Sequence, residues 1–240
     1  MLFLRSLLFS LGMATSTLVF APLSLLTFPL PLQQRYAFIS QWSRFNLWWL
    51  AVTCKLRYRV EGTENIPAHP SIILCKHQSA WETLALQMIF PPQVWLIKRE
   101  LLWVPFFGWG LAMLKPIAIN RQAARQALRQ LIDQGTQRLA DGLWVVIFPE
   151  GTRVAPGEKR PYAPGGAMLA HRTGHVVVPV AHNAGEFWPR RGFLKRPGTI
   201  RLVIGPPIPT TGHHASEINA LAERWIEDTM TRISGIGSGA

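Results

Sequence analysis

The sequence predicts an α/β fold, in which a mixed, mostly parallel sheet is flanked by helices and preceded by an N-terminal membrane-associated helical segment. Two observations lead to this expectation. Short β-prone runs alternate with helical patterns from about residue 61 onward, which is typical of an α/β sheet. The residues before that point are apolar and carry few charges, which is typical of a segment that meets lipid.

The predicted strands are short apolar runs, and they are residues 71–75, 94–97, 116–119, 143–148, 176–180 and 200–204. Between the third and fourth runs, residues 121–140 repeat apolar side chains at the spacing of one helical face. We expect this helix to be a crossover between strands. Residues 216–233 repeat the pattern and predict a C-terminal helix.

The first apolar segment, residues 6–32, contains no charged side chain. At about 1.5 Å per residue a helix of this length could cross a hydrocarbon core of about 30 Å. Pro22 and the prolines that follow it predict a kink or an end near Thr27. A cleaved signal peptide is the competing interpretation, but residues 19–21 form a poor cleavage context, which favours an anchor.

The next segment, residues 36–54, is a predicted amphipathic helix, with apolar side chains at Ile39, Trp42, Phe45, Trp49 and Val52. Its tryptophans suit a membrane interface, and a core helix packed on the main domain is the equal alternative. Five basic residues follow the first apolar segment closely and only Arg5 precedes it. This asymmetry predicts an inner (plasma) membrane protein whose catalytic domain faces the cytoplasm.

These patterns divide the 240 residues into three parts. Residues 1–60 are the predicted membrane-anchoring helices, residues 61–233 an α/β domain, and residues 234–240 a disordered tail. The length is close to that of one domain with a short additional element.

Charge and cysteine content limit the classes of partner and of site that the chain can have. Lys and Arg outnumber Asp and Glu by 25 to 13, a net charge of +12, which favours phosphorylated substrates, an acidic membrane leaflet or nucleic acid. No nucleic-acid-binding motif is recognisable and the basic residues are scattered among apolar segments, so we expect no nucleic-acid partner. Cys54 and Cys75 lack the spacing of a disulfide framework or a zinc site, and we expect no metal.

The first candidate for chemistry is His77, which follows an apolar strand and precedes a helical pattern that Pro91 and Pro92 end. Glu82 lies five positions later, and its carboxylate can fix the imidazole tautomer so that His77 acts as a general base. Ser79 and Glu82 also have the spacing of a capping box, in which Glu82 would serve only the helix start. The pair alone does not decide between these roles.

The second candidate is a polar turn that interrupts a strongly apolar strand. The turn reads Phe148, Pro149, Glu150, Gly151, Thr152 and Arg153. Gly151 permits a tight backbone path, and Arg153 offers a planar fork that matches phosphate oxygens. Glu150 could hold that arginine in place. An ordinary surface turn with a solvated ion pair is the alternative.

Together the two patterns resemble the glycerolipid acyltransferase family, and within it the 1-acylglycerol-3-phosphate acyltransferases. The family's histidine and acid motif matches His77 and Glu82, with glutamate where aspartate is more common, and its Glu-Gly-Thr-Arg motif matches without a change. Residues 116–121, which end in Arg121, resemble the second motif without its leading glycine. Lys98 resembles the family lysine that binds the acceptor phosphate, and residues 178–180 resemble the fourth motif, near the acyl site.

The resemblance implies an enzyme that moves a fatty acyl group from acyl-CoA or acyl-ACP, as a co-substrate and not a bound cofactor, to the sn-2 hydroxyl of lysophosphatidate. His77 and Glu82 would then be catalytic, and Lys98, Arg121 and the turn residues would bind substrate. The implied partners are a lysophospholipid, an acyl thioester, the bilayer and, for one donor, acyl carrier protein. Two alternatives remain: a different acceptor such as a lyso-ornithine lipid, and a non-catalytic basic membrane-binding protein.

Overall fold

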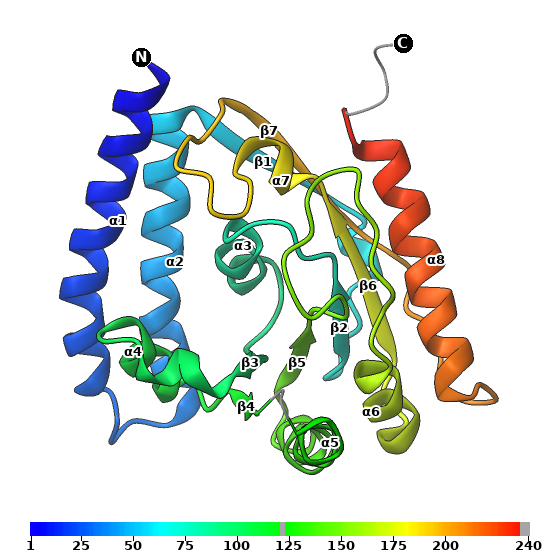
Figure 1. Ribbon diagram of the computed structural model, residues 1–240. Helices are drawn as coiled ribbons and strands as arrows, with labels where there is room; N and C mark the ends of the chain where they lie inside the picture. Colours follow the sequence, from blue (N-terminus) through cyan, green and yellow to red (C-terminus); the bar gives the residue numbers. More distant parts are fainter. Residues whose placement is uncertain (121–122, 236–240) are drawn as a thin grey trace.

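The computed structural model describes residues 1–120 and 123–235. Within them, seven strands form one sheet in the order β1-β7-β6-β2-β5-β3-β4 (Figure 1). All neighbours are parallel except the antiparallel pair β6 and β7, which confirms the predicted mixed, mostly parallel sheet. The strands are β1 (Leu56–Glu61), β2 (Ile72–Cys75), β3 (Gln93–Lys98), β4 (Ile117–Ile119), β5 (Trp144–Ile147), β6 (Val177–His182) and β7 (Gly198–Ile204).

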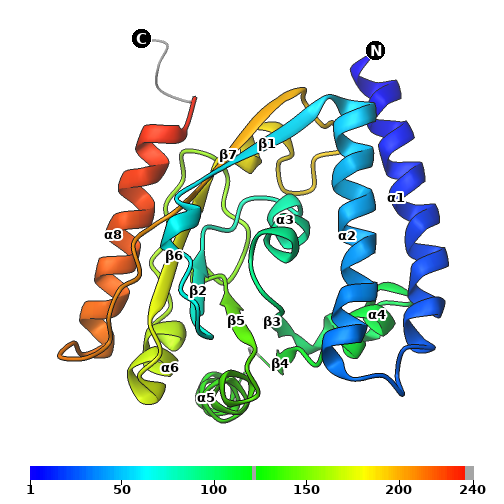
Figure 2. The same cartoon turned by 180° about the vertical axis from the view of Figure 1, so that it is seen from behind.

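Helices cover both faces of the sheet (Figures 1 and 2). They are α1 (Leu2–Leu25), α2 (Leu32–Cys54), α3 (Trp81–Ile89), α4 (Phe107–Met113), α5 (Ala124–Ala140), α6 (Gly165–Thr173), α7 (Ala184–Phe187) and α8 (Ala215–Ile233), with short 3-10 helices at Thr63–Asn65 and Arg99–Trp103. In both views α1 and α2 stand on one side of the molecule, and α8 stands on the other. The sheet therefore separates two cores, one beneath α2 and α3 and one beneath α5, α6 and α8.

All six predicted strands are present, but the sequence did not predict β1. This strand pairs only with β7, at the edge of the sheet, and its Arg57 and Arg59 side chains are exposed. It occupies residues that the sequence assigned to the N-terminal part, since α2 ends at Cys54 and the sheet begins at Leu56. The predicted tail is described only at Ser234 and Gly235, which both hydrogen-bond to Glu186.

The N-terminal segments form a helical hairpin whose contact face is polar and small. Asn46 donates to Ser16 at 3.3 Å, and Gly12 lets Trp49 lie against α1, since a Cβ there would overlap the indole. The predicted apolar face of α2 is only partly buried: Trp42 and Trp49 pack against the core and Val52 is exposed, whereas Ser43 and other polar residues are fully buried. Close packing through small and polar residues is typical of helices in lipid.

Both ends of α1 contact the α/β domain. In its first turns, Ser6 Oγ accepts the Lys195 N–H at 2.9 Å, and Phe9 packs edge-on against Trp188. Near its other end α1 packs against α4, where a Cβ on Gly110 would lie 3.5 Å from Ser24 Oγ. The helix ends at Leu25, close to the expected position near Thr27, and Pro22 lies inside it. α1 is therefore docked on the α/β domain at both of its ends.

Candidate active site

The site lies where central parallel strands end. β2 pairs with β5, so the loop that carries His77 emerges beside the turn that begins at Phe148. The imidazole stacks on the Phe148 ring, with centroids 3.9 Å apart and planes 12° from parallel. The carboxyl ends of neighbouring parallel strands are the usual place for a ligand site. The fold thus joins the two sequence motifs that lie about seventy positions apart.

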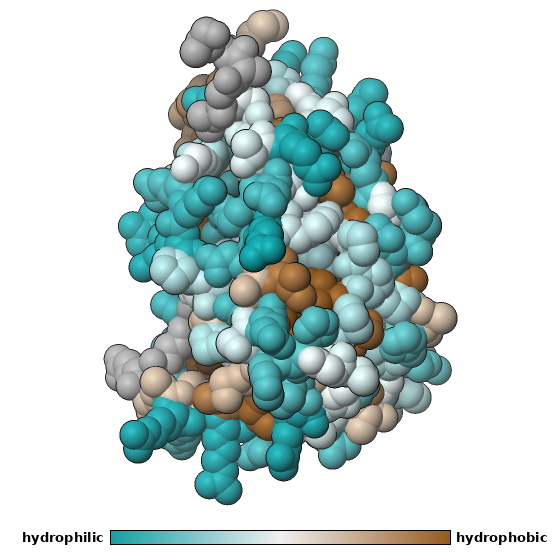
Figure 3. All heavy atoms as spheres, turned by 90° about the vertical axis from the view of Figure 1, so that its right-hand side faces the viewer, coloured by the Kyte–Doolittle hydropathy of each residue, from teal (hydrophilic) through white to brown (hydrophobic). Residues whose placement is uncertain are grey.

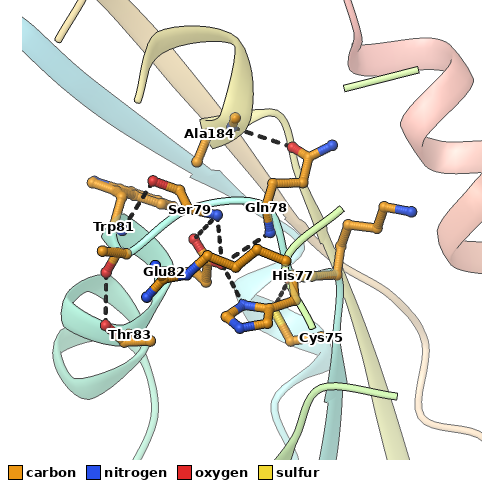
Figure 4. Close-up of polar contacts among 12 residues, drawn as sticks. Cys75, His77, Gln78, Ser79, Trp81, Glu82, Thr83 and Ala184 are labelled. Atoms are coloured by element: carbon orange, nitrogen blue, oxygen red, sulfur yellow. Dashed lines mark hydrogen bonds and ion pairs between the residues drawn. The ribbon is translucent and has the colours of Figure 1, made fainter. Parts of the chain in front are cut away.

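His77 and Glu82 form a hydrogen-bonded pair (Figure 4). His77 Nδ1 lies 2.8 Å from Glu82 Oε1, and Glu82, in the first turn of α3, is fully buried. The carboxylate also accepts the backbone N–H groups of Gln78 and Ser79. Ser79 Oγ accepts the N–H of Trp81, the first residue of α3. One carboxylate therefore makes both kinds of contact that the sequence left open, one with the imidazole and one with the backbone before the helix.

The surroundings favour the ionised form of Glu82. Burial raises its pKa, but the contacts with His182, His77 and the Ser79 N–H outweigh burial and hold the pKa below its ordinary value. A carboxylate next to Nδ1 makes that nitrogen the donor, which leaves Nε2 with its lone pair. His77 is therefore oriented as a base, and 15% of its side chain is exposed.

A second histidine, His182 at the end of β6, lies behind the pair and was missed from the sequence. It is fully buried; its Nε2 lies 2.8 Å from the Lys76 carbonyl oxygen and 3.8 Å from Glu82 Oε2. Its Nδ1 accepts the Ala184 N–H, so Nε2 is the donor. Burial lowers the pKa of His182, against the opposite effect of the Glu82 carboxylate. Its hydrogen bond to the Lys76 carbonyl oxygen fixes the backbone next to His77.

Glu150 does not hold Arg153, contrary to the expectation from the sequence. Its carboxylate lies 2.6 Å from Lys76 Nζ and accepts the His77 N–H at 2.7 Å. Lys76 is 1% exposed and also contacts Glu227 of α8 at 2.7 Å, and Tyr162 donates to Glu227. Burial raises the pKa of Glu150, against the effect of Lys76. This buried network ties the His77 loop to the turn and to α8.

A cavity of about 490 Å³ opens beside His77. Its walls come from α1, α2, α3, β3, α4 and the turn after β5, and most of them are apolar, such as Phe20, Trp42, Leu84, Leu111 and Leu114. Three cationic side chains, those of Lys98, Arg153 and Arg190, also line it. No acidic residue lines it within the ranges that the structure describes. The cavity thus combines space for an apolar chain with cations for an anionic group.

The structure places the residues that the sequence motifs singled out for substrate in four groups. Lys98, Phe148, Gly151, Thr152 and Arg153 line the cavity. Pro149 and Glu150 are buried and do not line it. Residues 178–180 lie in the buried strand β6, and Arg121 lies outside the described residues.

Three residues of the site could not be singled out from the sequence. Lys76 precedes His77, but its partner Glu227 lies 151 positions away, so no local pattern links them. His182 ends an apolar strand without a neighbouring motif. Arg190 is one of two adjacent arginines, and only the fold shows that it reaches the cavity.

Several known proteins are similar to this chain in sequence. A family model described as Acyltransferase matches residues 57–183, more than half of the chain. A 1-acyl-sn-glycerol-3-phosphate acyltransferase of Pseudomonas aeruginosa is 48% identical over 238 residues, which cover 97% of this chain and 93% of that protein. The human 1-acyl-sn-glycerol-3-phosphate acyltransferase beta is 30% identical over 75% of this chain and 66% of its own length.

The fold also has a counterpart among solved structures. The crystal structure of the 1-acyl-sn-glycerophosphate (LPA) acyltransferase PlsC from Thermotoga maritima matches with a TM-score of 0.81 and 22% identity, over 97% of this chain and 95% of that one. The match includes the helical hairpin, since so little of the chain is left out. With the family match over residues 57–183 and the 48% identity to the Pseudomonas protein, the chain belongs to the acyltransferase family.

Proposed function

We propose that the chain transfers a fatty acyl group from an acyl thioester to the sn-2 hydroxyl of lysophosphatidate, which yields phosphatidate. The observation that carries the proposal is the His77–Glu82 pair, 2.8 Å apart, on the wall of an apolar cavity that Lys98 and Arg153 also line. The names of the Pseudomonas and human relatives support this acceptor.

The chemistry follows from the orientation of His77. Nε2 takes the proton of the acceptor hydroxyl, and the hydroxyl oxygen forms a bond to the thioester carbonyl carbon. The carbon–sulfur bond then breaks, and the imidazolium returns its proton to the departing thiolate. Glu82 stabilises the imidazolium between these steps, with its own charge supported by backbone N–H groups. A thioester is already activated, so no acyl-enzyme is needed.

The cavity has one part suited to the phosphate of the acceptor and another suited to an acyl chain. Lys98 and Arg190 are exposed and Arg153 is half-buried, whereas Leu84 and Leu114 are buried. The cations therefore mark the part of the cavity that reaches water, and the buried side chains mark its interior. We assign the acceptor phosphate to the cationic part and an acyl chain to the apolar part. Acyl-CoA and acyl-ACP both fit this scheme as donors.

We further propose attachment to the cytoplasmic face of the inner membrane through one surface of α1. By length and composition α1 is the candidate span among the described residues, and large apolar side chains such as Phe3, Leu11 and Leu18 are exposed along it. Its contacts with the α/β domain at both ends favour a helix that lies along the bilayer surface rather than across it. The excess of basic residues after α1 supports the cytoplasmic side.

The test is turnover of purified protein with radiolabelled acyl-CoA or acyl-ACP and lysophosphatidate, followed as labelled phosphatidate. His77→Ala should lower the rate roughly 100- to 10,000-fold, the usual effect of removing a general base. The matched control is His69→Ala, an exposed histidine that precedes the same strand, and it should keep the wild-type rate. Near wild-type turnover by His77→Ala would refute the mechanism.

The acceptor is tested separately with a panel of lysophosphatidate, lyso-ornithine lipid and monoacylglycerol. Preference for lysophosphatidate is expected, and Arg153→Ala should reduce that preference because it removes a phosphate ligand. A faster reaction with lyso-ornithine lipid would replace the proposed acceptor. Lipid binding without turnover on any acceptor would point to a non-catalytic protein.

A further inference from the structure

The cationic part of the cavity has one member that the sequence motifs do not include and whose own contacts have not yet been described. Arg190 lies between α7 and β7, far in the chain from Lys98 and Arg153, and lines the same cavity. We propose that Arg190 binds a substrate phosphate together with these two residues. The inference rests on the proposed function, because it assumes that phosphate-bearing substrates enter this cavity.

The guanidinium lies directly beside the turn that carries Arg153. Arg190 Nη1 donates to the Arg153 carbonyl oxygen at 3.1 Å. A guanidinium has five N–H donors, and this bond uses one of them. No carboxylate of the described residues forms an ion pair with Arg190. A planar fork with free donors matches two oxygens of a phosphate, and the bond to the carbonyl fixes where the fork lies.

The segment around Arg190 is anchored on both sides, so the arginine is held in position before substrate binds. Trp188 is buried against Phe9 of α1, and Lys195 donates its N–H to Ser6. Between them, the Gly192 N–H donates to the Pro189 carbonyl oxygen at 2.9 Å and closes a tight turn. Little backbone entropy remains to be lost when the side chain meets a ligand.

Two sources could supply the phosphate. The acceptor carries a phosphate monoester, and both acyl-CoA and acyl-ACP carry the phosphate of a phosphopantetheine arm. The chemistry of recognition is the same, a phosphate bound by charge-assisted hydrogen bonds. Separate kinetic measurements on the acceptor and the donor distinguish them.

The test compares Arg190→Gln with Arg191→Gln, its neighbour on the same turn, which is exposed and does not line the cavity. For each variant, KM is measured for lysophosphatidate at saturating acyl-CoA and for acyl-CoA at saturating lysophosphatidate. Arg190→Gln should raise one of the two KM values about tenfold or more, while kcat changes far less, because a phosphate contact contributes to binding. Arg190→Lys should give an intermediate KM, because it keeps the charge and loses the fork.

The substrate whose KM rises, lysophosphatidate or acyl-CoA, is the one whose phosphate Arg190 binds. If both KM values of Arg190→Gln stay within about twofold of those of Arg191→Gln, which is less than one hydrogen bond contributes, the proposal is overturned. A thermal unfolding midpoint equal to that of Arg191→Gln checks that the exposed substitution leaves the fold intact.

Binding without turnover separates this proposal from the proposed function. The dissociation constants of lysophosphatidate and of coenzyme A are measured for wild type and both variants, with monoacylglycerol as the phosphate-free comparison. A wild type that forms no phosphatidate would refute the proposed function. Weaker binding of either phosphate ligand by Arg190→Gln alone would still support the role of Arg190, and unchanged binding of both would refute it.

Discussion

Two helices on opposite sides of the sheet, α1 and α8, bury different kinds of side chain. On one side of the sheet α1 buries Ser6, Ser16 and Ser24 and exposes leucines and phenylalanines. On the other side α8 buries Ile218 and Ile226, and the surface over it is largely hydrophilic (Figure 3). α8 follows the pattern of a helix between a core and water.

The exposed large apolar residues follow the same division. Within the described ranges they lie in α1 and the turn after it, in α2, around α4, at Tyr58 and at residues 193–194, with Leu221 of α8 as the exception. An exposed apolar surface of this extent is typical of a membrane or partner contact. One sheet therefore supports a face suited to lipid and a face suited to water, and the site lies on the lipid-suited side.

The largest expected effect comes from removing the buried cation that connects the His77 loop to α8. Lys76→Met leaves the carboxylates of Glu150 and Glu227 buried without their shared cation. Removing one partner of a buried ion network typically costs about 3–5 kcal/mol, so the free energy of unfolding should fall by that amount. Denaturant unfolding measures it. Exposed Lys159→Met is the matched control, and equal stability of the two variants would show that the buried network does not stabilise the fold.

The next effect is confined to the lipid-suited side. Glu82→Gln keeps the shape of the α3 start but cannot stabilise an imidazolium as a carboxylate does. We expect kcat to fall about 100-fold, or about 2.7 kcal/mol in activation free energy, with a smaller change in KM. Steady-state kinetics measures both. Wild-type kcat would mean that Glu82 only caps the helix.

A smaller effect should distinguish the two surfaces directly. Leu11→Glu on α1 and Leu221→Glu on α8 place the same charge at exposed leucines on opposite layers. Losing the burial of one leucine in lipid costs about 1.5–3 kcal/mol, so Leu11→Glu should weaken binding to phosphatidylcholine vesicles about tenfold or more. Leu221→Glu should leave it unchanged. Cosedimentation with neutral vesicles measures binding, and equal loss in both variants would contradict the assignment of the surfaces.

The smallest effect is a pH dependence of stability. The folded pKa of Glu82 lies below the ordinary value of 4.5, so its ionised form adds stability that is complete above that pH and is lost as pH falls through the folded pKa. The difference in unfolding free energy between wild type and Glu82→Gln should therefore be constant near neutrality and shrink in acid. Denaturant titrations over a pH series measure it. A difference that grows in acid would show that Glu82 is protonated in the folded protein.

The sequence predicted the strands of the sheet better than it predicted which helix faces are buried. The central strands β2, β5 and β6 were predictable because strands buried on both faces are short continuous apolar runs, and β3, β4 and β7 were recognisable because they also consist largely of apolar residues. β1 was missed because an edge strand with exposed arginines lacks that pattern. The apolar stripe of α2 was found, but periodicity identifies only the face that avoids water. Whether lipid or protein covers that face depends on the neighbouring helix. Here that helix is α1, which contacts α2 through small and polar residues.

The site was predictable where its chemistry is local. His77 with Glu82, and the turn ending in Arg153, are short-range patterns that the fold brings together. Long-range partners were not predictable, and Glu150 shows the consequence. The sequence suggested an ion pair between Glu150 and the nearby Arg153. In the structure Glu150 instead forms a buried ion pair with Lys76.

The docking of α1 along the domain has a kinetic consequence. Since α1 and α2 line the cavity, the proposed membrane attachment would let an acyl chain pass from the leaflet that α1 contacts into the site without crossing bulk water. On the proposed function, the quantity that sets the rate is then the mole fraction of lysolipid in the surface, not its concentration in the volume. Adding inert detergent or lipid at constant substrate should slow the enzyme by dilution in two dimensions.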